Sequence, residues 1–181
     1  RDRTCLVPGA DGFMGSHLTD ALVALGAIVI AFVRATSSGA LNNIARHRRD
    51  VTVVFADLTD KTSIDHMVRN HLLTAPDKPY VFHLGAYTHV GKSWNRVDEC
   101  IQTNIQGTVN LLMAVERTGF TRFLNTGTSE IYGDIEVPFR EDAAVHPISP
   151  YSVSKHCAEE YCRLFADARD LPLVRVRPFN A

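Results

Sequence analysis

The chain has 181 residues and a formal net charge of −1, and 45% of its residues are hydrophobic and 22% charged. These values suit one soluble globular domain with a sizeable core. The near-neutral charge gives no reason to expect binding to nucleic acid or to an anionic membrane. No apolar run approaches the ~20 residues that a membrane span needs. The four scattered cysteines lack metal-ligand spacing, so we expect no metal site and reduced thiols, as in a cytoplasmic protein.

Short apolar runs alternate with longer helical patterns along the chain. The predicted strands are 4–7, 28–33, 51–55, 80–84, 123–126 and 173–176, and the predicted helices are 16–25, 62–72, 95–117 and 150–168. Continuous Val, Ile and Leu strands separated by helices indicate a parallel sheet buried on both faces. Right-handed crossovers then predict an α/β fold with a doubly wound parallel sheet, the Rossmann fold.

A glycine-rich turn joins the first strand to the first helix. Gly9, Gly12 and Gly15 form the pattern G-x-x-G-x-x-G, with Phe13 and Met14 before the last glycine. Glycines permit a tight turn and let the backbone approach a pyrophosphate, while the helix N-terminus supplies N–H donors and partial positive charge. A plain strand–helix loop is the alternative. The position between a strand and a helix favours a dinucleotide-binding turn.

The residue that contacts the adenosine ribose is expected ~20 positions beyond this turn, at the end of the second strand. Arg34 stands there, with Ser37 and Ser38 close behind and Val33 where a carboxylate would favour NAD. A guanidinium with hydroxyls suits a 2′-phosphate, so NADP is the favoured cofactor. An arginine that stacks on adenine would fit NAD as well, so NAD stays possible.

Tyr151 and Lys155 lie four residues apart, so they share one face of the helix predicted at 150–168. A tyrosine hydroxyl has a pKa near ~10 and is a poor base, and a neighbouring ammonium lowers that pKa. Thr128 and Glu130 follow the fifth strand, at the edge where open α/β sheets bind ligands. We expect Thr128 to share a substrate hydroxyl proton with Tyr151 and Glu130 to remove a proton beside a ketone. A solvated loop glutamate is the alternative for Glu130.

Several motifs together resemble the extended short-chain dehydrogenases, over essentially the whole chain. They are the turn at 9–15, His83-Leu84-Gly85-Ala86, Asn104 with Gly107-Thr108, Thr128-Ser129-Glu130, Ser149-Pro150-Tyr151 through Lys155, and Arg177-Pro178-Phe179-Asn180. The Thr-Ser-Glu run is similar to that of nucleotide-sugar 4,6-dehydratases, particularly the GDP-mannose 4,6-dehydratase type. The resemblance implies Thr128, Glu130, Tyr151 and Lys155 as the catalytic set. It also implies a cofactor in contact with Asp57, Leu58, Leu84, Gly85, Ala86, Tyr151 and Lys155.

The chain departs from the family pattern at a few positions. Pro8 stands where the family usually has threonine, and Gly85 stands where alanine is usual. Ser129 occupies the position of an aspartate in the dTDP-glucose dehydratases, which leaves the general acid open. His83 and His89 flank the loop on the cofactor side, and we expect both to be structural.

The resemblance implies an enzyme that oxidises a nucleotide sugar at C4, eliminates water across C5 and C6, and returns the hydride to C6. A 4-epimerase, which would not need Glu130, is one alternative, and a non-catalytic cofactor-sensing scaffold is another. The resemblance further implies a homodimer or higher homo-oligomer, built from the helices around 97–117 and 151–168. Because the chain stops directly after a strand, we expect residues 1–181 to be the NAD(P)-binding domain, with a substrate-binding part after residue 181.

Overall fold

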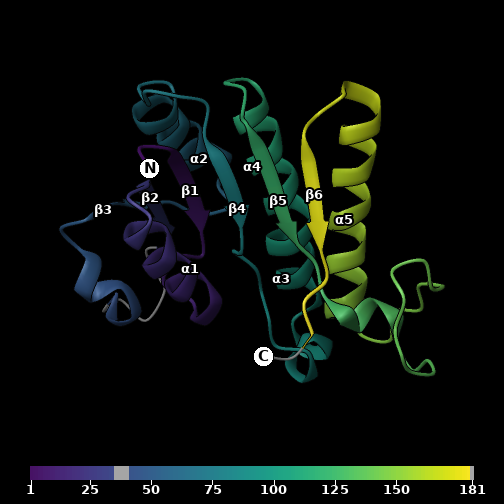
Figure 1. The fold of residues 1–181 in the computed structure, drawn as a ribbon. Helices are drawn as coiled ribbons and strands as arrows, with labels where there is room; N and C mark the ends of the chain where they lie inside the picture. The colour runs from purple at the N-terminus through teal and green to yellow at the C-terminus, as the bar shows by residue number, and fades with distance from the viewer. Residues whose placement is uncertain (35–40, 180–181) are drawn as a thin grey trace.

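The computed structural model describes residues 1–34 and 41–179, and it contains one six-stranded sheet in the order β3-β2-β1-β4-β5-β6. Every neighbouring pair of strands is parallel. The strands are β1 (Thr4–Pro8), β2 (Ile28–Val33), β3 (Val51–Phe55), β4 (Tyr80–His83), β5 (Arg122–Thr126) and β6 (Leu173–Val176). The predicted strands and the doubly wound sheet are therefore confirmed, with single-residue differences at some strand ends (Figure 1).

The helices also lie where the sequence pattern predicts them. They are α1 (Phe13–Ala24), α2 (Lys61–Met67), α3 (Val97–Glu99), α4 (Gly107–Glu116) and α5 (Pro150–Arg169). Wider π-helical turns extend α2 over Val68–Leu72 and join α3 to α4 over Cys100–Gln106. The first helix begins three residues earlier than predicted, because the last part of the glycine-rich turn already forms its first turn.

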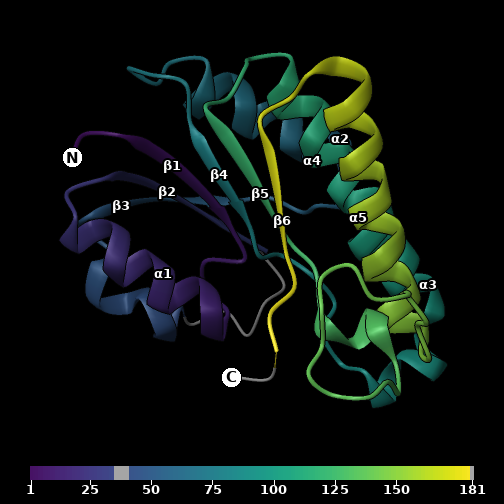
Figure 2. The ribbon, with the colours of Figure 1, turned by 45° about the vertical axis from the view of Figure 1, so that its right-hand side comes forward.

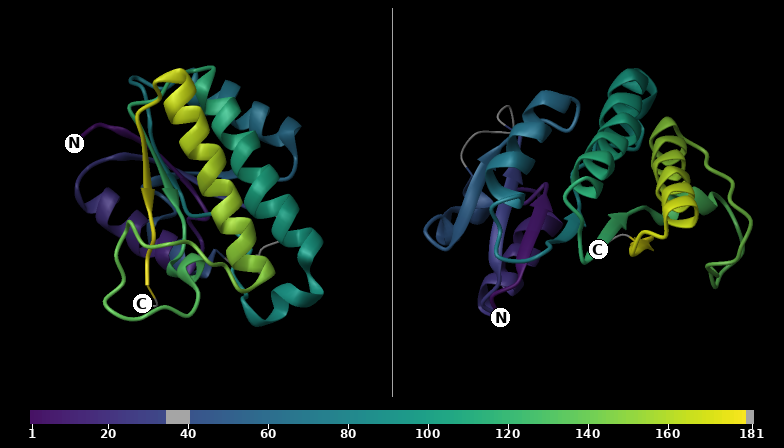
Figure 3. Two further views of the ribbon diagram at one scale, coloured as in Figure 1. Left: turned by 90° about the vertical axis from the view of Figure 1, so that its right-hand side faces the viewer. Right: turned by 90° about the horizontal axis from the view of Figure 1, so that it is seen from above.

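Helices cover the two faces of the sheet, and the strands alternate their side chains between them (Figure 3). Leu6 of β1 points into a core with α2, α4 and α5, whereas Cys5 and Val7 point into a second core with α1 and the short turn Asn42–His47. The expected burial on both faces is correct for β1 and β2. It is wrong for the edge strands β3 and β6, which are partly exposed because each has only one neighbouring strand.

The carboxyl ends of the strands meet at one edge of the sheet, and α5 begins at the same edge (Figure 2). Ser149 caps α5: its hydroxyl accepts a hydrogen bond from the Ser152 backbone N–H at 3.0 Å, and the Ser152 hydroxyl accepts from the Ser149 N–H at 3.0 Å. Pro150 occupies the first helical position, where its missing N–H has no consequence. This start fixes Tyr151 in the first turn of α5, beside the strand ends.

Within residues 1–34 and 41–179, no helix is both long and apolar enough to cross a bilayer. The same residues contain no group of three or more His, Cys, Asp or Glu side chains placed to hold a metal ion. All four cysteines are free thiols.

Candidate active site

A cavity of about 650 Å³ opens along the carboxyl edge of the sheet. It brings together residues from the glycine-rich turn, from the ends of the strands and from the first turns of α5. The predicted residues that line it are Gly9, Gly12, Phe13, Met14, Gly15, Arg34, Asp57, Leu58, Leu84, Gly85, Ala86, Thr128, Tyr151 and Lys155. Ser37, also predicted to bind the cofactor, lies outside the described residues. Glu130 is described, but it is not part of the cavity wall.

The glycine-rich turn has the close backbone approaches that its sequence predicts. A Cβ at Gly15 would overlap the carbonyl oxygen of Gly9, and Gly9 itself has a φ of +83°. A Cβ at Gly9 would lie 2.8 Å from the backbone nitrogen of Gly85. Gly12 begins α1 without a side-chain cap, and the first turn of α1 contains no acidic residue. The helix N-terminus can therefore offer its backbone N–H groups to an anion.

Another part of the cavity wall is formed by residues that follow β2 and β3. Arg34 lies in the wall directly after Val33, which is fully buried and supplies no carboxylate. Asp57 also lies in the wall, and its Oδ1 accepts hydrogen bonds at 2.8 Å from both the N–H and the hydroxyl of Thr59. The turn, the helix N-terminus and these residues together fit an elongated dinucleotide with a phosphate at its centre.

Tyr151 and Thr128 lie in the same wall, and both are buried. Burial raises the pKa of the Tyr151 phenol, and the Thr128 side chain lowers it by less. The negative charge of Glu130 raises the pKa of Tyr151 further. The expectation that Lys155 lowers this pKa is wrong for the protein alone: the pKa is raised, chiefly by burial, and Lys155 is not among the groups that shift it.

Lys155 is only 5% exposed, at the inner side of the cavity. Burial lowers its pKa to about 8, while the nearby Cys162 and Glu159 act in the opposite direction. At neutral pH the side chain is still mainly an ammonium ion. A positive charge is therefore kept inside the site, one helical turn from Tyr151.

Glu130 lies in the short turn Ser129–Tyr132, directly after β5. The Thr128 hydroxyl caps this turn by accepting a hydrogen bond from the Glu130 backbone N–H at 3.2 Å. The Glu130 side chain is half-buried, outside the cavity wall and on the same short segment as Thr128. The structure thus brings three of the predicted catalytic residues into the cavity and the fourth beside it.

His83 lies beneath the cavity, fully buried in β4. The Thr108 hydroxyl donates to the Asn104 carbonyl oxygen at 2.6 Å, so the His83 Nε2 donates to the Thr108 oxygen at 2.9 Å. Burial lowers the pKa of His83 to about 3, helped by the charge of Lys155, so the ring is neutral at neutral pH. Asn104 in turn accepts from the Tyr87 N–H at 2.8 Å and donates to the Ser154 hydroxyl at 2.9 Å. This chain of hydrogen bonds fixes the loop after β4 against α5.

Sequence reasoning missed part of the cavity wall. The missed residues are Pro8, Asp11, Phe32, Ala56, Thr88, Thr103, Thr126, Gly127, Pro178 and Phe179. Many of them lie at or just after the carboxyl end of a strand. The rule that parallel sheets bind ligands at this edge, applied to every predicted strand, could have found those.

A family model described as GDP-mannose 4,6 dehydratase matches residues 6–181. The match spans nearly all of the chain, including the glycine-rich turn and both ends of the Tyr151 helix. The chain belongs to this family. Its members are extended short-chain dehydrogenases, as the motifs suggested.

Named relatives of this dehydratase family include both dehydratases and epimerases. A probable dTDP-glucose 4,6-dehydratase of Sinorhizobium fredii is 31% identical over 182 residues, which cover 93% of the chain and 51% of that protein. The structure of a UDP-glucose 4-epimerase of Thermotoga maritima, solved with UDP-glucose, has a TM-score of 0.85 at 31% identity and covers 96% of the chain and 54% of its own. A Thermus thermophilus UDP-glucose 4-epimerase in complex with NAD has a TM-score of 0.85 at 27% identity, with 96% and 54% covered. The chain spans about half the length of these proteins.

The burial of neutral His83 predicts a loss of stability in acid. Because its folded-state pKa of about 3 lies below the ordinary 6.5, the unfolded chain binds the extra proton first as the pH falls. Between pH 6.5 and about pH 3, His83 should lower the free energy of unfolding by about 1.4 kcal/mol for each pH unit of acidification. In His83→Gln, whose amide can still donate to Thr108, that part of the slope should disappear in urea titrations from pH 7 to pH 4. Equal slopes for both proteins would contradict the assignment.

Proposed function

We propose that the chain is the cofactor-binding and catalytic part of a nucleotide-sugar 4,6-dehydratase. The observation that carries the proposal is the position of Glu130, directly after β5 in the short turn that is capped by Thr128, a residue of the cavity wall. Oxidation of an alcohol alone does not need this carboxylate, whereas removal of a proton beside a ketone needs a base. The family match supports the same assignment.

The described residues fit a nicotinamide dinucleotide. The turn at 9–15 and the N-terminus of α1 would hold the pyrophosphate, Arg34 and Asp57 the adenosine end, and Lys155 the nicotinamide ribose. When bound, the cofactor accepts a hydride from the substrate and later returns it. We favour NADP, because Val33 stands where a carboxylate would suit NAD and Arg34 follows it. NAD is the alternative, since the Thermus thermophilus relative was solved with NAD.

In the proposed reaction, Tyr151 takes the proton of the sugar C4 hydroxyl, with Thr128 sharing that hydrogen bond. The raised pKa of Tyr151 means that its phenol stays protonated in the free protein, so it needs added positive charge to act as a base. Glu130 then removes the C5 proton, which the adjacent ketone has made acidic, and the C6 hydroxyl takes up a proton and leaves as water. The hydride returns to C6, and C5 takes a proton from solvent.

A 4-epimerase is the second candidate, because the solved relatives described above catalyse that reaction and because Glu130 lies outside the cavity wall. An epimerase would return the hydride to C4 on the opposite face and would make no use of Glu130. We place the choice of nucleotide and sugar in a further part of the protein, in keeping with the greater length of the relatives.

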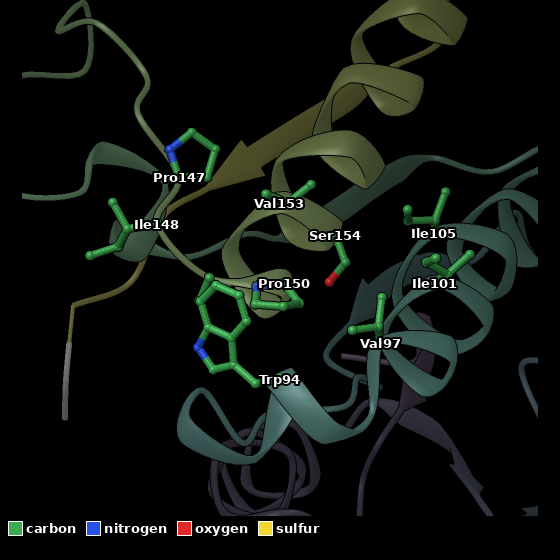
Figure 4. A pocket seen from close by; sticks show the side chains of 10 residues that line it. Trp94, Val97, Ile101, Ile105, Pro147, Ile148, Pro150, Val153 and Ser154 are labelled. Atoms are coloured by element: carbon green, nitrogen blue, oxygen red, sulfur yellow. The ribbon is translucent and has the colours of Figure 1, made fainter.

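We also propose that the chain forms a homodimer through the α3–α4 helix and α5, which lie side by side over one face of the sheet (Figure 3). An apolar hollow of about 430 Å³ lies between these helices at their N-terminal ends (Figure 4). Trp94 is 65% exposed there, and Ile101 and Val153 are about half exposed. Burying such side chains against a second copy would remove apolar surface from water.

Glu130→Gln should separate the two candidate reactions. The variant keeps the side-chain shape and removes the proton acceptor, so a dehydratase should reduce its bound cofactor on mixing with substrate and then stall. Stopped-flow absorbance with GDP-mannose, dTDP-glucose and UDP-glucose should show persistent reduced nicotinamide, with product formation slowed by about 10²–10⁴. Glu136→Gln, at an exposed position of the same loop, is the matched control. Turnover of Glu130→Gln at the wild-type rate would transfer the assignment to the epimerase.

Arg34→Ala tests the cofactor preference. A charge-assisted contact between Arg34 and a 2′-phosphate stabilises NADP by roughly 1.5–3 kcal/mol, so its loss should weaken NADP binding about tenfold or more. NAD binding should stay nearly unchanged, and Arg48→Ala, an exposed arginine outside the cavity, should affect neither cofactor. Calorimetric titration measures both affinities. Equal losses for the two cofactors would instead indicate that Arg34 stacks on adenine.

Ile101→Glu tests the dimer. A charge in the middle of the buried apolar surface should convert a dimer into a monomer at micromolar concentration, as measured by light scattering. Leu73→Glu, which changes an exposed leucine at the end of α2, should leave the dimer intact. A wild-type protein that is already monomeric would refute the proposal.

A further inference from the structure

A buried ion pair lies behind the cavity, among residues that the proposed reaction does not use. Glu159 is 1% exposed and lies on α5, one helical turn beyond Lys155. Arg177, directly after β6, donates from Nε to the two carboxylate oxygens of Glu159 at 3.0 and 3.2 Å, and from Nη2 to Oε1 at 2.6 Å. Arg175 adds a longer contact of 3.6 Å to the same carboxylate. The helix that carries Tyr151 is thereby joined to the end of β6.

The other side of the Arg177 guanidinium contacts the segment that follows β5. Its Nη1 donates to the Tyr132 hydroxyl at 2.6 Å and to the Glu141 carbonyl oxygen at 3.1 Å. The guanidinium carbon also lies 5.1 Å from the centre of the Tyr132 ring. Tyr132 is the last residue of the turn Ser129–Tyr132, so Arg177 holds the end of the turn that contains Glu130.

The two ends of this turn are held in different ways. At its start, backbone hydrogen bonds continue the β5–β6 ladder, from Gly127 N–H to the Val176 oxygen at 2.7 Å and from Ser129 N–H to the Pro178 oxygen at 3.1 Å. At its end, the side chain of Tyr132 depends on Arg177. Thr128 is therefore fixed by the backbone. At the far end of the turn, the Ile131 carbonyl oxygen accepts from the His146 N–H at 2.8 Å, and the guanidinium of Arg177 holds the side chain of Tyr132.

The chemistry of this contact requires arginine. A buried carboxylate without its partner is strongly destabilising, and the planar guanidinium can satisfy Glu159 on one side while it donates to Tyr132 on the other. The hydrogen bonds to Glu159 raise the pKa of Arg177, so its guanidinium stays charged. A lysine could neutralise Glu159 but could not reach both partners with fixed geometry.

We propose that Arg177, held by Glu159, is a positioning residue for the step that Glu130 performs. By fixing Tyr132 against α5, it sets where the Glu130 carboxylate lies relative to Tyr151, and therefore relative to the C5 proton of a sugar oxidised at C4. This inference rests on the proposed dehydratase function. It predicts that damage to the contact slows the elimination of water and spares the oxidation at C4, because Thr128, Tyr151 and Lys155 are held by other bonds.

Tyr132→Phe in the complete enzyme is the direct test, because it removes only the hydroxyl that accepts from Arg177 and keeps the buried ring. In single-turnover mixing with the nucleotide sugar that the wild type converts, the rate of cofactor reduction should stay within about twofold of the wild type. Formation of the 6-deoxy-4-keto product should be at least about tenfold slower. Arg177→Lys should shift the ratio of the two rates in the same direction, and it provides the readout if Tyr132→Phe folds poorly.

Tyr80→Phe is the matched control. Tyr80 is the first residue of β4, at the end of the strand that lies away from the cavity. The control should leave both rates unchanged. If Tyr132→Phe and Arg177→Lys slow both steps equally, the contact is only structural and the inference is overturned. Wild-type rates for both steps in both variants would overturn it too. A wild-type enzyme that reduces its cofactor but forms no 6-deoxy-4-keto product would overturn the proposed function itself, and the inference with it.

Discussion

The pairing of β1 with β2 on one side and with β4 on the other is the constraint on which the site depends. The chain winds away from β1 in one direction through β2 and β3 and then returns to continue in the other direction. At this reversal, the connections after β1 and β4 diverge and leave room for a ligand. The turn at 9–15 and the loop at 84–86 approach each other there closely enough to require glycine at Gly9, where a Cβ would lie 2.8 Å from the Gly85 nitrogen. The cavity is therefore a consequence of strand order, and its chemistry comes from the residues at the strand ends.

Burial controls the electrostatics of the cavity. Loss of water raises the pKa of Tyr151 and lowers the pKa of Lys155 to about 8. It also lowers the pKa of His83, which keeps that ring neutral. In all three side chains, burial favours the uncharged form. Behind the cavity, Glu159 keeps its buried carboxylate by pairing with Arg177.

Local patterns were sufficient to predict the fold, and together with the family resemblance they predicted most of the cavity. The period of the apolar residues located the strands and helices, and the spacing of Tyr151 and Lys155 placed both on one face of α5. The same spacing gave no measure of burial, so the predicted effect of Lys155 on the pKa of Tyr151 was wrong. The contact between Arg177 and Tyr132 was also out of reach, because it joins residues that are 45 positions apart through tertiary packing. The position of Glu130 just outside the cavity wall depends on that packing too.

Turnover in heavy water tests the central claim most directly. A base that removes the C5 proton exchanges it with solvent before the sugar is reprotonated, so a dehydratase should place one deuterium at C5 of a 6-deoxy-4-keto sugar. An epimerase breaks only bonds at C4 and leaves the C5 hydrogen untouched. We predict that the wild-type enzyme, given GDP-mannose, dTDP-glucose or UDP-glucose in heavy water, yields the C5-deuterated product by NMR with the one it accepts. Recovery of a 4-epimer with no deuterium at C5 would contradict this account.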